Sequence, residues 1–167
     1  MKARTFLFVV SLGLLVACRD PHAGHDHSDH DHDHGDHGHE HAHSHAHDAP
    51  HGGTGVELGS HQAHLELLRD AESGLMKLWV MDAHMQNYVR IPAENILIKA
   101  KVGEEVKGLS FASVANEVTG ETIGDSSYFE AMAEWVKTTE SFEGEIVSLE
   151  IRGMKFDGQT FEFPAKK

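Results

Sequence analysis

The stretch AHLELLRDAESGLMKLWVMD, residues 63–82, decides the fold that the sequence predicts. Two runs of β-forming residues flank the segment DAESG at 70–74, whose composition is typical of a turn. This arrangement predicts a β-hairpin. Pairing residues whose numbers sum to about 144 places Leu65 opposite Trp79 and brings His61 near His84.

Further strand candidates continue outward from this hairpin, at turn spacings of about 8–12 residues. They lie at residues 56–58, 88–91, 95–102, 105–112, 145–151 and 154–163, the last with a bulge predicted at Asp157 and Gly158. Ser127 and Glu130 have capping-box spacing and predict a short helix over residues 131–137. We therefore expect residues 54–167 to form a mainly β domain, an antiparallel β-sandwich of about seven to eight strands with one short helix.

A histidine-rich segment precedes this domain. Thirteen of the sixteen histidines lie between residues 22 and 51, and most alternate with Asp, Gly, Ala or Ser. They are His22, His25, His27, His30, His32, His34, His37, His39, His41, His43, His45, His47 and His51. Such a composition cannot bury enough apolar surface to offset the entropy lost on ordering the chain. Residues 18–53 are therefore predicted to form a disordered tether.

Closely spaced imidazoles and carboxylates make this tether a candidate metal binder, since neutral imidazole is a common ligand of zinc, copper and nickel. We expect several ions to bind with modest affinity and poor selectivity, with zinc as the first choice and copper or nickel next. Imidazole titrates near pH ~6.5, so mild acid would expel the metal. The alternative is a solvated spacer whose histidines bind nothing.

Residues 1–17 have the composition of a targeting signal. Lys2 and Arg4 precede an apolar run at 6–16, which is shorter than the roughly 20 residues of a membrane-spanning helix. The run ends in Leu15-Val16-Ala17-Cys18, which resembles the lipobox of bacterial lipoproteins. The resemblance implies cleavage before Cys18, lipidation of Cys18 and a place in the cell envelope, at the outer membrane facing the periplasm. An ordinary secretory signal with an incidental cysteine is the alternative.

Net charge and motif content argue against several classes of function. The formal charge of −13 disfavours nucleic acid and anionic lipid surfaces as partners, so membrane contact is expected through the lipid anchor only. The sequence has no glycine-rich phosphate loop, no Gly-x-Ser-x-Gly elbow and no His-Glu-x-x-His pair, and Cys18 is its only cysteine. We predict that the protein is not an enzyme and holds no organic cofactor.

Three histidines lie within the predicted domain. In the predicted hairpin, His61 and His84 lie close together with Asp82 nearby, and they could bind one ion with His51 or a tether histidine completing its coordination. His64 is expected on the opposite face, because it lies three residues from His61 along a strand. The alternative is that these are surface histidines with ordinary hydrogen bonds.

Several short motifs resemble proteins of the bacterial envelope. HGG at 51–53, VELG at 56–59, HLEL at 64–67, LWVMDA at 78–83 and GDSSYF at 124–129 resemble small His-rich periplasmic lipoproteins. The HGG opening and the first hairpin are also similar to the N-terminal extension of heavy-metal efflux adaptor proteins. These resemblances imply a β-domain and a metal-related role in the envelope. The chain lacks the long helical hairpin of an adaptor, so it would not be an adaptor by itself.

Together these features predict a lipid-anchored periplasmic protein that binds a divalent transition metal. It would buffer the metal or deliver it to an efflux or uptake system, and the sequence leaves both directions and the partner open. The alternative is a structural or interaction lipoprotein whose β-domain binds an envelope partner, with the tether as a pH-sensitive spacer.

Overall fold

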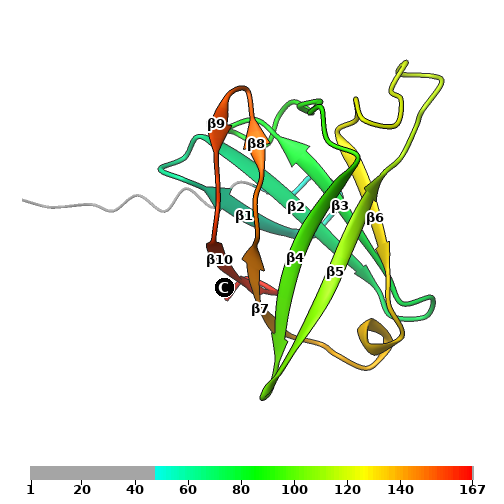
Figure 1. Ribbon diagram of the computed structural model, residues 1–167, viewed down its shortest axis with the longest axis vertical. Coiled ribbons are helices and arrows are strands. Elements are labelled where there is room, and N and C mark those ends of the chain that lie inside the picture. The colour runs from blue at the N-terminus through cyan, green and yellow to red at the C-terminus, as the bar shows by residue number, and fades with distance from the viewer. Residues whose placement is uncertain (1–47, 167) are drawn as a thin grey trace, which may run out of the picture. The chain divides into compact units, whose positions relative to one another are not determined.

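The computed structural model describes residues 48–166, which form a mainly β structure (Figure 1). Its strands are β1 (Thr54–Leu58), β2 (Ala63–Asp70), β3 (Leu75–Met81), β4 (Asn95–Val102), β5 (Glu105–Ser113), β6 (Tyr128–Met132), β7 (Phe142–Ile146), β8 (Glu150–Ile151), β9 (Met154–Lys155) and β10 (Gln159–Phe163). Eight of them form one antiparallel sheet in the order β1-β2-β3-β6-β5-β4-β7-β10, and β8 pairs with β9. Helical structure among the described residues is confined to one 3₁₀ turn, η1 (Glu134–Lys137). No helix in this part of the chain is long and apolar enough to span a membrane.

The sheet curls until its two edge strands, β1 and β10, approach each other (Figure 1). The side chain of Gln159 joins them. Its Nε2 donates to the carbonyl oxygen of Glu57 at 2.8 Å, and its Oε1 accepts the Gly59 N–H at 3.0 Å. A side-chain amide thus bridges the seam, and the nearly closed sheet encloses one interior.

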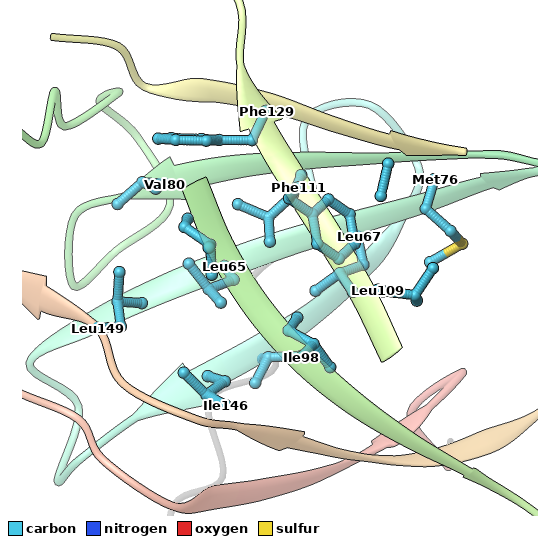
Figure 2. Packing of buried hydrophobic residues seen from close by; sticks show 14 of the residues in the cluster. Leu65, Leu67, Met76, Val80, Ile98, Leu109, Phe111, Phe129, Ile146 and Leu149 are labelled. Carbon is cyan, nitrogen blue, oxygen red and sulfur yellow. The ribbon is translucent and has the colours of Figure 1, made fainter. Parts of the chain in front are cut away.

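Side chains of alternating strand positions fill this interior. On β4, Ile98 is fully buried while its neighbour Lys99 is exposed, as period-two geometry requires. Figure 2 shows Leu65, Phe111 and Ile146, from three different strands, within the same buried cluster. Burying one such side chain contributes about 1.5–3 kcal/mol, so the core is the main source of stability.

The predicted fold class, mainly β and antiparallel, is confirmed. The strands form one nearly closed sheet, and its opposite sides face each other across the core as the two sheets of a sandwich do. The strands predicted at 95–102 and 105–112 correspond to β4 and β5. The strand predicted at 145–151 is interrupted between β7 and β8, and the segment at 88–91 contributes isolated bridges.

The helix predicted over residues 131–137 is wrong for its first half. Residues 128–132 form β6, which pairs with β3, and helical geometry begins at Glu134. Phe129 and Ala131 are buried on the inner side of the sheet, so period-two burial outweighs the local helix signal. Ser127 does not cap a helix, because its backbone N–H and its hydroxyl both donate to Glu121.

The first hairpin forms between β2 and β3, but its predicted register is wrong by one residue. Leu65 lies opposite Val80, and Glu66 lies opposite Trp79. Directly opposed residues of an antiparallel pair share a face of the sheet. Leu65 and Val80 therefore point into the core, whereas Glu66 and Trp79 lie on the outer face of the sheet.

Candidate metal site

The pairing of β1 with β2 places a carboxylate beside an imidazole on the outer face. Glu57 and His64 are direct cross-strand partners. Their neighbours Leu58 and Leu65 are fully buried in the core, so Glu57 and His64 project from the opposite side of the sheet. Opposed side chains at this spacing can interact directly.

The tight turn between β1 and β2 adds a second imidazole. Gly59 and His61 both adopt positive φ angles, 61° and 59°, which reverse the chain within residues 59–62. The Glu57 carboxylate stabilises this turn, because its Oε1 accepts the His61 N–H at 2.9 Å and its Oε2 lies 3.6 Å from His61 Nδ1. The His61 and His64 ring centroids are 5.2 Å apart. The prediction that His64 lies on the opposite face from His61 is therefore wrong, since His61 belongs to a turn and not to a straight strand.

Glu57, His61 and His64 form a group that can hold a metal ion. One ligand atom from each lies within 4.8 Å of the other two. Ligand atoms around a tetrahedral zinc ion are about 3.3–3.5 Å apart, so modest side-chain rotations would bring this group to bonding geometry. His64 is buried, whereas Glu57 is exposed and His61 partly exposed, which leaves the group accessible from solvent. Two imidazoles and a carboxylate suit zinc and its transition-metal neighbours.

His84 lies near His61, with 5.8 Å between their ring centroids. The predicted proximity of His61 and His84 is thus confirmed. Asp82 has a different position from the one expected. Its Oδ1 accepts the N–H groups of His84 and Gln86 at 3.2 and 2.9 Å, and its Oδ2 accepts the side-chain amide of Asn87 at 2.6 Å. The structure therefore places Asp82 inside the loop after β3, outside the group that Glu57, His61 and His64 form.

Hydrogen bonding keeps the Asp82 carboxylate ionised. Burial acts to raise its pKa, but hydrogen bonds from the Asn87 side chain and from the N–H groups of Gln86, Asn87 and His84 outweigh that effect. The pKa is lowered to about 2. A carboxylate with this many donors fixes the conformation of its loop.

The His51 side chain contacts Glu66, Trp79 and Tyr88, none of which belongs to this group. Its N–H and the N–H of Gly53 donate to Glu66 Oε1 at 2.8 and 2.9 Å, and its Nδ1 lies 2.8 Å from Glu66 Oε2. The His51 ring stacks on Trp79, with 3.8 Å between centroids and 11° between planes, and its Nε2 lies 3.2 Å from the Tyr88 hydroxyl. We call this arrangement of residues 51–53 on Glu66 and Trp79 the His51 clamp. The packing of the domain thus begins before Thr54.

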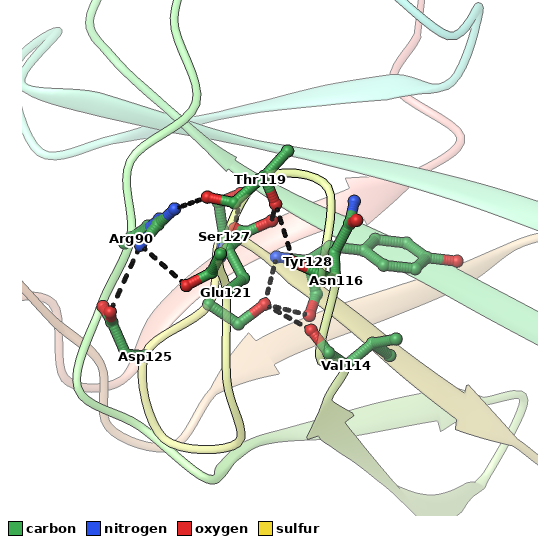
Figure 3. Close-up of polar contacts among 10 residues, drawn as sticks. Arg90, Val114, Asn116, Thr119, Glu121, Asp125, Ser127 and Tyr128 are labelled. Atoms are coloured by element: carbon green, nitrogen blue, oxygen red, sulfur yellow. Dashed lines mark hydrogen bonds and ion pairs between the residues drawn. The ribbon is translucent and has the colours of Figure 1, made fainter.

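A second polar network fixes the segment before β6 (Figure 3). Ser127 Oγ donates to Glu121 Oε1 at 2.6 Å, and Ser126 Oγ lies 2.9 Å from the carbonyl oxygen of Val114. Arg90 donates to the carbonyl oxygen of Thr119 on the same segment. Burial acts to raise the pKa of Glu121, but hydrogen bonds from Ser127 and Thr119 lower it overall. These buried serines hold the loop and the strand together.

The predictions for residues 1–47 lie outside the described residues. They are the targeting signal at 1–17, the lipidation of Cys18 and the ligands expected among the histidines from His22 to His47. These stay predictions.

Sequence reasoning missed Glu57 and His64 as members of the group. The signal that would have found them is the short segment GSHQ at 59–62 between two apolar runs, which fits a tight turn. A β1–β2 hairpin around that turn sets Glu57 opposite His64. No protein-family model matches this chain, and no curated protein or solved structure matches it significantly.

Proposed function

We propose that this protein binds a divalent transition metal ion at Glu57, His61 and His64, zinc first, with copper or nickel next. The observation that supports the proposal is the convergence of three ligand atoms within 4.8 Å on the outer face of β1 and β2. The neutral imidazole and the ionised carboxylate are the forms that bind metal, so binding should weaken as the pH falls.

The histidine-rich segment supplies further ligands in this proposal. Its repeated His-x-His spacing gives many two-ligand sites of modest affinity, which would capture ions at high capacity. The site on the domain would hold a single ion more tightly, because its ligands are already close together in the folded sheet. The two parts would therefore differ in affinity and in number of ions.

We place this activity in the cell envelope. The proposal rests on the apolar run and the Leu15-Val16-Ala17-Cys18 motif, which favour export and attachment of lipid to Cys18. Metal held there would be buffered or passed to an efflux or uptake system. The protein would perform no chemical reaction on the ion.

Zinc titration tests the proposal in two forms of the full chain. In the first, all residues are native. In the second, the tract-silenced chain, each histidine from His22 to His47 is changed to serine. We expect the native chain to bind several ions and the tract-silenced chain to bind one ion with micromolar or lower Kd, which corresponds to about −8 kcal/mol or better.

Variants of the tract-silenced chain locate the ion. Glu57→Gln and His61→Ala should each weaken binding at least tenfold, since each removes one ligand. Glu143→Gln is the matched control, because Glu143 is an exposed acid on β7, away from the group. A tract-silenced chain that binds no zinc would disprove the site on the domain. A native chain that also binds none would favour the interaction lipoprotein instead.

A further inference from the structure

The loop after β3 brings a fourth candidate ligand to the same group. His64 lies opposite Met81 at the end of the β2–β3 ladder. His61 lies three residues before His64, and His84 lies three residues after Met81. Because the strands are antiparallel, these two segments leave the sheet at the same end. The β1–β2 turn and the β3 loop therefore lie side by side on the outer face.

This loop is fixed from both sides. Asp82 accepts hydrogen bonds from the backbone of His84 and Gln86 and from the side chain of Asn87. Met85 adopts a φ of 54° and its side chain is buried. Its sulfur packs over Gly55, where a Cβ atom would lie only 3.2 Å from it. His84 is thus held between two anchored residues while its own side chain stays exposed.

The separations of His61 from His64 and from His84 fit a shared ion, although His84 lies outside the group whose ligand atoms are all within 4.8 Å of one another, so its ring would have to move toward the ion. Zinc–nitrogen bonds are about 2.0–2.1 Å, so two imidazoles on one tetrahedral ion have ring centroids about 5 Å apart. The observed separations are 5.2 Å for His61 with His64 and 5.8 Å for His61 with His84. His61 is thus a neighbour of both other rings, and the Glu57 carboxylate lies 3.6 Å from His61 Nδ1.

We infer that His84 is the fourth ligand of the metal site, so that one ion is enclosed by three imidazoles and the Glu57 carboxylate. This inference rests on the proposed metal site and assigns its coordination. Four protein ligands leave no open position for water or substrate, which is the pattern of a site that holds zinc. A tetrahedral set also favours zinc over copper(II), which prefers tetragonal geometry.

Asp82 acts as a positioning residue in this assignment. It touches no ion, but it holds the backbone of His84 and so sets where the ring lies. Residues that orient metal ligands typically change affinity by about 10–100-fold when replaced. Asp82→Asn should therefore weaken zinc binding in the same direction as removal of His84.

Cobalt(II) binding to the tract-silenced full chain provides the test, because the visible bands of cobalt are intense in four-coordinate sites and weak in six-coordinate ones. We expect intense bands with His84 present, and we expect His84→Ala to abolish them and to weaken zinc binding at least tenfold. His84→Cys should restore the bands and add a sulfur-to-cobalt charge-transfer absorption, which His84→Ala lacks although Cys18 is present in both. Gln86→Ala, in the same loop, is the matched control and should change neither the bands nor the affinity.

The outcomes separate the two proposals. If cobalt and zinc bind with unchanged bands and affinity in His84→Ala, the site exists and the assignment of His84 is wrong. If neither ion binds to the tract-silenced chain with His84 intact, the proposed metal site itself fails. Thermal unfolding of each variant shows whether the fold is retained, and the exposed position of His84 predicts that it is.

Discussion

Two histidine–glutamate pairs lie on the outer face of the same sheet, and their environments differ. In the His51 clamp, the Glu66 side chain is 0% exposed, both its oxygens are engaged, and the His51 ring is stacked on Trp79. In the group of Glu57, His61 and His64, the Glu57 side chain is 52% exposed. Its Oε2 lies 3.6 Å from Nδ1 of His61, whose side chain is 33% exposed. The residue types are the same, but the carboxylate of the first pair is buried, and we call this pair closed. The carboxylate of the second pair is exposed, and we call this pair open.

In the proposed function, this difference separates a structural contact from a candidate ligand set. Pulling Glu66 out of the clamp would break three interactions and leave a buried acid without donors, which is costly. Glu57 gives up less, because water already reaches its carboxylate. A metal ion would therefore bind at the open pair and leave the closed pair intact. Three predictions test this contrast, and a fourth concerns the loop after β3 that carries His84.

The largest effect is expected at Glu66. Glu66→Ala should lower the free energy of unfolding by about 3 kcal/mol, because it removes the three hydrogen bonds that the buried Glu66 carboxylate makes with His51 and Gly53. Glu57→Ala should cost less than about 1 kcal/mol, since its carboxylate is exposed. Urea unfolding measures both. Equal losses for the two variants would remove the distinction between a closed and an open pair.

For zinc affinity the order of the two positions should be reversed, so that replacing Glu57 has a larger effect than replacing Glu66. In the tract-silenced chain, Glu57→Gln should weaken zinc binding at least tenfold, or about 1.4 kcal/mol, while Glu66→Gln should leave the Kd within about threefold. Competition against a chromophoric chelator gives both values. A stronger effect at Glu66 than at Glu57 would show that the clamp is the binding site.

His51 should contribute to stability and not to metal affinity. His51→Ala removes the stack on Trp79 and two contacts of the ring, and we expect a loss of about 1 kcal/mol. Fluorescence in a Trp135→Phe background, in which Trp79 is the remaining tryptophan, reports the stack directly. Its emission should change in His51→Ala and stay constant in His61→Ala. If His51→Ala lost zinc binding and its fluorescence stayed unchanged, His51 would be a metal ligand and not a structural residue.

The smallest effect is an acid-dependent contribution from Asp82. Its pKa is lowered from 3.8 to about 2, so its contribution to stability is present above pH 4 and is lost as the pH falls towards 2. Between pH 5 and pH 2.5 the urea midpoint of the native chain should therefore fall more than that of Asp82→Asn. Parallel curves for the two proteins would show that the loop does not depend on this carboxylate.

The sequence predicted the strands well because burial alternates with period two along them. The inward positions on β4, such as Ile96 and Ile98, follow directly from that alternation, whereas on β2 the outward residues His64 and Glu66 are buried as well. The register of the first hairpin could not be predicted from the sequence, because the composition of residues 70–74 indicates a turn without fixing how many residues it contains. The five residues of β6 are too few for a period-two pattern to be recognised in the sequence, and the strand becomes evident only from its pairing with β3.

The candidate site was predictable in part. The closeness of His61 and His84 follows from any hairpin centred near residues 72–73, and the ring separation confirms it. Glu57 and His64 are cross-strand partners around the turn at 59–62, which the sequence indicates. What the sequence does not indicate is the left-handed conformation of His61, which few non-glycine residues adopt and which brings its ring to this pair. The hydrogen bonds that Asp82 accepts come from residues 84–87 of the same loop, and only the folded structure defines the conformation of that loop.

Anomalous diffraction at the zinc edge, from crystals of the zinc-loaded tract-silenced chain, tests the central claim most directly. The account predicts one peak on the outer face of β1 and β2, about 2.0–2.2 Å from an oxygen of Glu57 and from ring nitrogens of His61 and His64. A peak between His51 and Glu66, or no peak at any residue from 48 to 166, would contradict it.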